Sequence, residues 1–283
     1  MAQTMLKKNR ILQMLEQNQI PLGMQCFTGD PILIEIMGIT GFDWVMLDSE
    51  HSGNNPRAME HLIRAAECVG LVPFVRVTQA TDEADIHRAL EAGAKGIFLP
   101  EIGSIEDVKK AADAAFFPPK GNRGICPAVR AAHYNDKTFV DYTTWNNSEI
   151  LLVPMIENPN ALADLEGICA LPYVHMIVFA AGDLGFSLNE GMGMLSGPKV
   201  SAAYKQVLET AKRHNVAVIG GPILNADAEG CKKALEDGIT VFSLGLDSLG
   251  FRSYCQQMVN ALDQAVTGSR YTRPSKRDWG FKA

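Results

Sequence analysis

The chain has 283 residues, of which 47% are hydrophobic and 20% are charged, a composition typical of a folded globular protein. No run of 18 apolar residues occurs. The first nineteen residues mix charged and apolar positions, whereas a signal peptide needs an uninterrupted apolar core. We therefore expect a cytoplasmic protein with no membrane partner.

The charge is unevenly distributed along the chain. The net charge is −6, but residues 269–283 contain five cations and one anion, so the remaining body carries 21 basic and 31 acidic residues, a net of −10. An acidic body repels phosphate, which predicts no nucleic-acid partner. The tail fits a solvated extension or a strap across a neighbouring subunit, and binding to RNA or an anionic membrane is the alternative. Its cations are Arg270, Arg273, Lys276, Arg277 and Lys282.

Six cysteines are scattered along the chain without any C-x-x-C spacing. This pattern argues against a thiolate zinc site and against a disulfide framework, so we expect a reducing compartment.

Short apolar runs alternate with amphipathic stretches. Between the runs the period changes to 3.6, as in residues 58–69, where Leu62, Ala65 and Val69 fall on one helical face. A helix after each strand implies right-handed crossovers and a parallel sheet, and eight such units predict a closed (β/α)₈ TIM barrel. The eight predicted strands span residues 22–26, 44–48, 72–77, 96–100, 151–156, 175–179, 216–220 and 241–246.

Two segments stand outside this alternation. The first twenty residues predict a helix that caps the barrel floor, and residues 116–148 predict a long connection of the kind that is usually functional or mobile. We expect one barrel domain over residues 1–268 and a basic tail over 269–283. A doubly wound open sheet is the alternative fold, but no G-x-G-x-x-G links a strand to a helix.

Two carboxylates follow neighbouring strands of the predicted barrel, at the end where such folds build their active sites. Glu157 closes the fifth strand and Asp183 follows the sixth. Carboxylates this close repel each other unless a proton or cation lies between them, and oxygen ligands favour Mg²⁺ or Mn²⁺. In the alternative, Asn158 caps a helix that starts at Pro159, and Glu157 is a bystander.

Arg76 lies within the otherwise apolar strand predicted at 72–77, where a guanidinium must find an anion. It either forms an ion pair between strands or stabilises negative charge on a substrate oxygen, and the nearby Asp48 and His51 favour the second role. Asp48 can orient the His51 ring as a general base, although His51 also fits an ordinary loop histidine. Glu50 either serves waters at the metal or faces solvent.

Several kinds of site are missing from the sequence. None of the eight predicted strands contains a lysine, which argues against Schiff-base chemistry, and neither a G-x-S-x-G elbow nor a P-loop occurs. The pair Gly220 and Gly221 is similar to a barrel phosphate loop, but Pro222 removes one of the amides that such a loop uses.

Six dispersed stretches, in this order, resemble one known family: GFDWVMLDSEH at 41–51, PFVR at 73–76, GAKGIFLP at 93–100, PPKGNRG at 118–124, MIE at 155–157 and GDL at 182–184. The family is the metal-dependent class II aldolases of the HpcH/HpaI type, which includes 4-hydroxy-2-oxoheptanedioate aldolase. The resemblance covers about residues 22–265.

The resemblance implies a role for each candidate. Glu157 and Asp183 would be the ligands of Mg²⁺ or Mn²⁺, and Arg76 would stabilise an enolate. His51, paired with Asp48, would be the general base and would act through a metal-bound water.

The resemblance also implies the reaction and the assembly. The backbone at Gly182 and Asp183 would hold the pyruvate carboxylate. Apart from the resemblance, we also predict that Glu50 contributes to substrate binding. Retro-aldol cleavage of a 4-hydroxy-2-oxo acid would give pyruvate and an aldehyde. The assembly implied is a homo-oligomer, a hexamer whose subunits exchange C-terminal helices.

Three departures from the family leave the second substrate open. Met155 stands where relatives often carry glutamine, residues 180–184 read AAGDL, and residues 125–145 differ. The same enolate chemistry on oxaloacetate or an acyl-CoA ester, including bond formation or decarboxylation, is one alternative. A non-enzymatic metabolite-binding barrel is the other.

Overall fold

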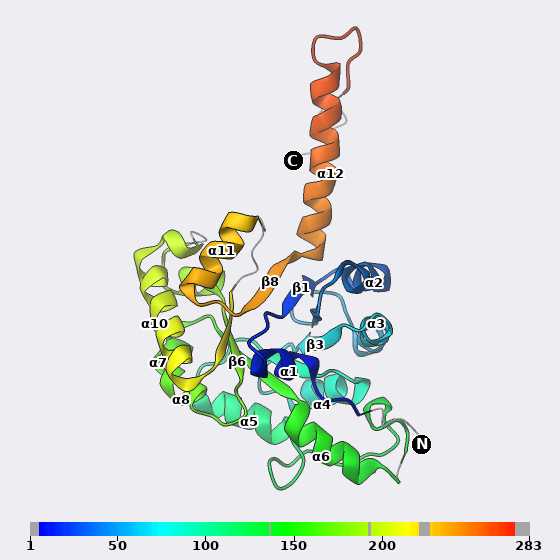
Figure 1. The fold of residues 1–283 in the computed structure, drawn as a ribbon, viewed down its shortest axis with the longest axis vertical. Helices are drawn as coiled ribbons and strands as arrows, with labels where there is room; N and C mark the ends of the chain where they lie inside the picture. Colours follow the sequence, from blue (N-terminus) through cyan, green and yellow to red (C-terminus); the bar gives the residue numbers. More distant parts are fainter. Residues whose placement is uncertain (1–5, 136, 192–193, 221–226, 275–283) are drawn as a thin grey trace. The chain divides into compact units, whose positions relative to one another are not determined.

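The computed structural model describes residues 6–135, 137–191, 194–220 and 227–274. Eight parallel strands pair in chain order, and β1 pairs with β8, so the barrel is closed (Figure 1). This confirms the predicted (β/α)₈ TIM barrel, and each strand ends within one residue of its predicted limits. The strands are β1 (Leu22–Cys26), β2 (Trp44–Asp48), β3 (Val72–Arg76), β4 (Gly96–Leu99), β5 (Leu151–Ile156), β6 (Met176–Phe179), β7 (Ala217–Gly220) and β8 (Val241–Leu246).

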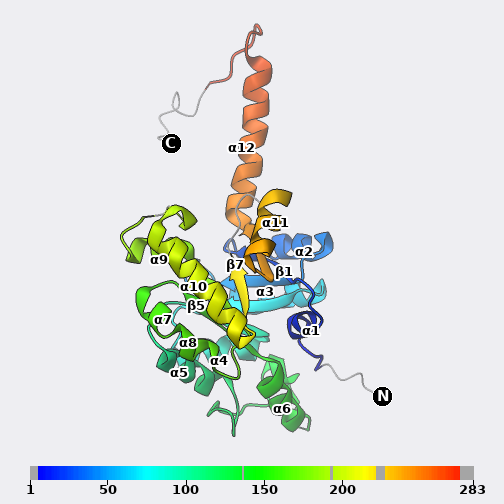
Figure 2. The same cartoon turned by 60° about the vertical axis from the view of Figure 1, so that its left-hand side comes forward.

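Helices follow the strands on the outside of the barrel, and α8 lies beside α10 there (Figure 2). Six helices of the chain, α1 included, have an Asn or Asp N-cap whose side chain accepts a backbone N–H, so local sequence sets where they begin. The helices are α1 (Arg10–Glu16), α2 (Pro31–Thr40), α3 (Pro56–Cys68), α4 (Glu83–Ala92), α5 (Ile105–Ala115), η1 (Arg130–Ala132), α6 (Phe139–Glu149), α7 (Pro159–Ala163), α8 (Leu165–Cys169), α9 (Ala181–Ser187), η2 (Met194–Ser196), α10 (Pro198–His214), α11 (Ala228–Asp237) and α12 (Asp247–Val266).

Large side chains fill the barrel interior. The rings of Trp44, Phe74 and Phe98 pack together with centroids 5.6 to 6.0 Å apart. Glycine is required where the Trp44 ring crosses β1, because a Cβ at Gly23 would overlap that ring. The interior is therefore a packed core, and any site must lie at one end of the barrel.

Helix α1 covers the end of the barrel where the strands begin, as predicted for a capping helix. Ile11 is fully buried against the interior aromatic residues. The Asn9 side chain caps α1 and donates to the carbonyls of Lys95 (3.1 Å) and Glu149 (2.8 Å). Arg10 pairs with Asp43, which also accepts the backbone N–H of Leu22. These contacts hold α1 to the starts of three strands.

The segment at 116–148 differs from the long connection that was predicted. It contains η1 and α6, and a small core of its own forms around Phe117 and Tyr142. Trp145 donates its indole N–H to the carbonyl of Lys7, and a single residue separates the end of α6 from the start of β5. The segment therefore lies at the floor of the barrel, away from the strand ends that carry the predicted site residues.

The chain divides into two compact units, residues 1–247 and 248–283. The predicted boundary after residue 268 remains a prediction. Helix α12 supplies most of the described part of the second unit, where Phe251, Met258 and Leu262 are exposed and Arg273 pairs with Asp263. Three of the predicted tail cations, Lys276, Arg277 and Lys282, lie outside the described residues. No helix in the described part of the chain is long and apolar enough to cross a membrane.

Candidate active site

Asp48 and Arg76 end two adjacent strands in direct register, which places them side by side at the barrel mouth. Asp48 is fully buried, and Arg76 is 7% exposed. Arg76 Nε donates to Asp48 Oδ1 at 2.6 Å, and Nη1 lies 2.9 Å from Glu50 Oε2. The third guanidinium nitrogen, Nη2, is buried without a hydrogen-bond partner in the structure. Because unpaired buried donors are unfavourable, this atom is positioned to receive an acceptor from outside the protein.

Glu50 and His51 lie in the turn that follows β2. Asp48 accepts the backbone N–H groups of Glu50 (3.3 Å) and His51 (2.9 Å), so the carboxylate that holds Arg76 also shapes the turn. The His51 side chain is 65% exposed, and its Nε2 lies 3.6 Å from Glu50 Oε2. The ring is thus beside Glu50, whereas Asp48 contacts the histidine backbone. Burial raises the pKa of Glu50, and the nearby Arg76 charge opposes that shift.

Glu157 follows β5 directly and is 7% exposed. Its Oε1 accepts the backbone N–H of Glu101. Burial raises the pKa of Glu157 to about 7, the Glu101 hydrogen bond opposes this, and the charge of Asp183 adds to it. A carboxylate that is buried near a second carboxylate gains from a cation, because the cation offsets both burial and repulsion.

Asp183 and Gly182 lie in the first turn of α9, immediately after β6. Asp183 is exposed and Gly182 is half-buried. The first N–H groups of a helix have no acceptor within the helix, so the backbone here offers donors. Asp183, Glu50 and Arg76 are near enough to Glu157 for their charges to affect the pKa of its carboxyl, Asp183 and Glu50 raising it and Arg76 lowering it.

Two further residues lie close to this group, and neither was assigned a role from the sequence. Glu101 adopts a left-handed backbone (φ 50°), unusual for a residue with a side chain, and that conformation accompanies its N–H bond to Glu157. The Phe27 ring lies 5.4 Å from the Arg76 guanidinium. Buried Asp247 accepts the backbone N–H of Phe27 at 2.9 Å, which holds the ring in place. In the sequence, Glu101 is marked only by its position just after β4, and Phe27 only by its position just after β1.

The donor set fits a hard divalent cation. Glu157 and Asp183 supply carboxylate oxygens, and Glu157 is a buried acid whose charge no Lys or Arg neutralises by direct contact among the described residues. No group of three or more His, Cys, Asp or Glu side chains suited to a metal occurs in the described residues. An ion held by two carboxylates would take its other ligands from water and substrate, which is usual for Mg²⁺.

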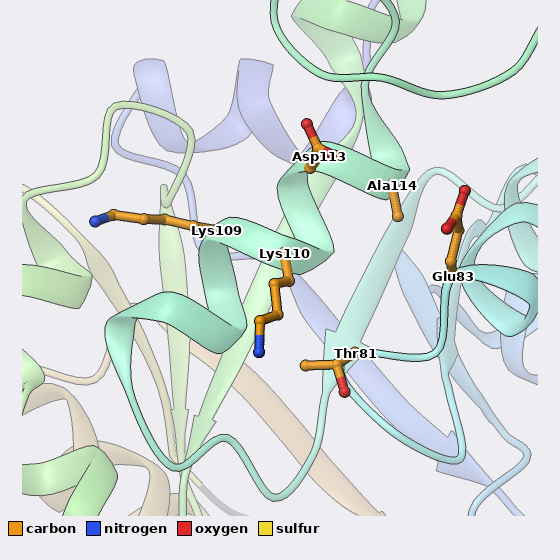
Figure 3. Close-up of a pocket in the computed structure, with 6 residues that line it drawn as sticks. All are labelled: Thr81, Glu83, Lys109, Lys110, Asp113 and Ala114. Carbon is orange, nitrogen blue, oxygen red and sulfur yellow. The ribbon is translucent and has the colours of Figure 1, made fainter.

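Other features are remote from this group or fall outside the described residues. A surface pocket of about 400 Å³ between the start of α4 and the side of α5 has none of the predicted site residues in its lining (Figure 3). Lys109 points away from Thr81 and Glu83 in that view. Gly220 ends β7, but Gly221 and Pro222, which were considered for phosphate binding, lie outside the described residues.

Comparisons with known proteins identify the family to which the chain belongs. A family model described as HpcH/HpaI aldolase/citrate lyase matches residues 23–253. The 2-dehydro-3,6-dideoxy-6-sulfogluconate aldolase of Pseudomonas putida is 30% identical over 88% of this chain and 95% of its own. An HpcH/HpaI aldolase/citrate lyase family protein from Burkholderia cenocepacia J2315 has a TM-score of 0.82 at 26% identity, covering 90% of this chain and 99% of its own. The citrate synthase SbnG has a TM-score of 0.79 at 26% identity, covering 89% and 97%.

Proposed function

The chain belongs to the HpcH/HpaI aldolase/citrate lyase family and is a lyase, and from this premise we propose that it is a divalent-metal-dependent aldolase. Its substrate would be a 4-hydroxy-2-oxo acid, cleaved to pyruvate and an aldehyde. The name of the Pseudomonas putida relative supports this class, because a 2-dehydro-3-deoxy sugar acid is a 2-oxo acid. The other alternative from sequence, a non-enzymatic metabolite-binding barrel, does not agree with membership in a family of lyases.

The proposal depends on one observation, the contacts of the Arg76 guanidinium. Two of its nitrogens are fixed by Asp48 and Glu50, and buried Nη2 remains without a partner. Cleavage of the C3–C4 bond moves an electron pair toward the C2 oxygen of the substrate. A guanidinium already fixed beside that oxygen stabilises the developing enolate without reorganising, which is usually the largest electrostatic contribution to catalysis.

The remaining residues would bind the substrate and transfer its proton. Glu157 and Asp183 would hold Mg²⁺ or Mn²⁺, which when bound supplies Lewis-acid polarisation of the 2-oxo group. The first-turn backbone at Gly182 and Asp183 would receive the carboxylate. His51 would accept the proton of the 4-hydroxyl group, since its exposed ring is free to approach substrate, and Asp48 would act by shaping the turn that carries it. The enolate then takes a proton at C3 to give pyruvate.

Chelation followed by metal restoration tests the proposal. We expect pyruvate release from a panel of 4-hydroxy-2-oxo acids to disappear after thorough chelation and to return with Mg²⁺ or Mn²⁺. Asp183→Asn should weaken that restoration, whereas Asp141→Asn, the same change at an exposed position on α6, should not. Pyruvate release that survives thorough chelation would contradict the metal-dependent mechanism.

Bond formation is the second candidate, because the 26% identical SbnG is a citrate synthase. The same fixed guanidinium could stabilise an enolate that attacks a second oxo acid. Incubating the protein with oxaloacetate or pyruvate and a panel of acceptors distinguishes the two, since a synthase forms a larger acid faster than it cleaves one. The hexamer implied by the family resemblance and the cytoplasmic location remain predictions.

A further inference from the structure

Phe27 follows β1 directly and lies beside the guanidinium of Arg76 at the barrel mouth. The Arg76 Cζ lies over the Phe27 ring, 5.4 Å from the ring centroid, which is within the range of a cation–π contact. Phe27 is half-buried, and its side chain also packs against the apolar core inside the barrel. The ring therefore covers one face of the guanidinium and is itself supported by the core.

Asp247, the residue that follows β8, holds the backbone of the turn that carries Phe27. Strands β1 and β8 are adjacent in the barrel. Asp247 Oδ1 accepts the backbone N–H of Phe27 at 2.9 Å, and Oδ2 accepts the backbone N–H of Thr28 at 3.0 Å and its hydroxyl at 2.5 Å. Burial raises the pKa of Asp247, but these hydrogen bonds outweigh burial and lower it, so the carboxylate is ionised near neutral pH. Charge-assisted hydrogen bonds thus fix the turn from which the ring extends.

The contacts that Arg76 makes with carboxylates act within the plane of its guanidinium. Nε donates to Asp48 and Nη1 pairs with Glu50, whereas Nη2 is buried with no partner among the described residues. Contacts in the plane do not prevent water from reaching the two faces of the group, and they do not prevent the plane from tilting. A ring against one face excludes water from that face and restricts the tilt, so it helps to set the direction in which Nη2 points.

We propose that Phe27 is a positioning residue, which holds the Arg76 guanidinium so that Nη2 meets the C2 oxygen of the substrate. This inference rests on the proposed aldolase function. Donors stabilise a developing negative charge most when they are oriented before the reaction, so losing the ring slows enolate formation even though every donor remains. Phe27 lies outside the six stretches that carry the family resemblance, and its role is assigned from the structure.

Deuterium exchange at C3 of pyruvate tests the proposal, because exchange requires the enolate but no aldehyde. A base removes a C3 proton, the electron pair moves to the C2 oxygen, and a deuteron from D₂O then returns to C3. Phe27→Leu keeps an apolar side chain but removes the ring. With the full-length protein and Mg²⁺, we expect its kcat for exchange, followed by NMR, to fall about tenfold. KM for pyruvate should stay within about threefold, because the change affects chiefly the transition state.

Two further variants separate the ring from packing in general. Phe27→Tyr keeps an aromatic face and should stay within about threefold of the wild-type kcat. Phe117→Leu makes the same change at the barrel floor, where the Phe117 ring lies 4.7 Å from the Arg123 guanidinium. This control should lower the melting temperature and leave kcat unchanged. If Phe27→Leu fails to fold, Phe27→Met takes its place, because the flexible methionine side chain can fill the space of the ring.

A double-mutant cycle shows whether Phe27 acts through Arg76. The Arg76→Lys change leaves no planar fork to be oriented. In that background, Phe27→Leu should therefore lower kcat by less than about twofold. If the ring only covered the barrel core, Phe27→Leu would cause the same loss in both backgrounds, since the effects of independent residues add.

The outcomes separate this inference from the function on which it rests. Exchange by the wild type, the loss in Phe27→Leu, its recovery in Phe27→Tyr and its absence in the Arg76→Lys background together support the proposal. Exchange by the wild type with an unchanged kcat in Phe27→Leu, no recovery in Phe27→Tyr, or equal losses in both backgrounds would overturn the positioning role and leave the aldolase function standing. Absence of exchange by the wild type with Mg²⁺ would overturn both.

Discussion

At the floor of the barrel, polar side chains are fixed by protein partners: Asn9 bonds two carbonyls and caps α1, and Arg10 pairs with Asp43. At the mouth, Arg76 keeps a buried nitrogen without a partner, and Glu157 is a buried carboxyl near a second one. The floor therefore uses polar residues for stability, whereas the mouth keeps unsatisfied groups for a ligand at a cost to stability.

The largest expected effect is that of Arg76→Lys. Lysine keeps the positive charge beside Asp48 but lacks the planar fork that engages two carboxylates and still presents a third nitrogen. We expect kcat for aldol cleavage to fall about 10² to 10³-fold, as for loss of an oxyanion donor, with little change in the melting temperature. Arg10→Lys at the floor is the matched control and should leave kcat unchanged. A kcat within threefold of wild type for Arg76→Lys would remove Arg76 from the mechanism.

Glu157→Gln should separate stability from activity. The pKa of the Glu157 carboxyl is about 7 in the folded protein, above its ordinary value of 4.5. Protonation of this carboxyl therefore stabilises the folded state. That stabilisation is complete below about pH 4.5 and is lost as pH rises through 7. In EDTA at pH 8, the variant should therefore be more stable than wild type by about 3 kcal/mol. With Mg²⁺ restored, the wild type should regain aldolase activity and the variant should not.

Urea unfolding of the metal-free proteins at pH 5 and pH 8 measures this difference. Glu149→Gln is the floor counterpart, because Glu149 accepts the Asn9 backbone N–H at 2.6 Å. That variant should be less stable than wild type. If Glu157→Gln were also destabilising at pH 8, the mouth carboxyl would be part of the structural framework, and the contrast between the two ends would fail.

The sequence was a good guide to features that depend on side-chain pattern. The spacing of apolar residues and the positions of turn residues located every strand to within one residue. In the structure, Asp48 and Arg76 at the ends of two of these strands lie in register. The exception is α6, because the apolar residues of its sequence, FVDYTTWNNSE, do not gather on one helical face. Tertiary packing of Tyr142 and burial of Asn146 hold it instead, and these depend on the segment at 116–123, distant in sequence.

Features that depend on backbone position were not predictable. The Glu101 N–H reaches Glu157 because the chain turns into a left-handed conformation after β4, and every residue type carries the same N–H. The direction of the His51 ring was also open, since Asp48 could meet either its side chain or its backbone. The structure shows the backbone contact, which makes Glu50 the carboxylate beside the ring.

The smallest expected effect is that of Asn9→Ala at the floor. The change removes the cap of α1 and leaves the carbonyls of Lys95 and Glu149 without their amide donor. We expect a loss of about 1 to 2 kcal/mol in unfolding free energy, measured by urea denaturation. Because the strand ends that carry Arg76 and Glu157 lie at the opposite end of a packed barrel, kcat/KM should stay within twofold of wild type. A large fall in kcat/KM, with folding intact at the assay temperature, would mean that α1 influences the mouth through the Trp44, Phe74 and Phe98 core.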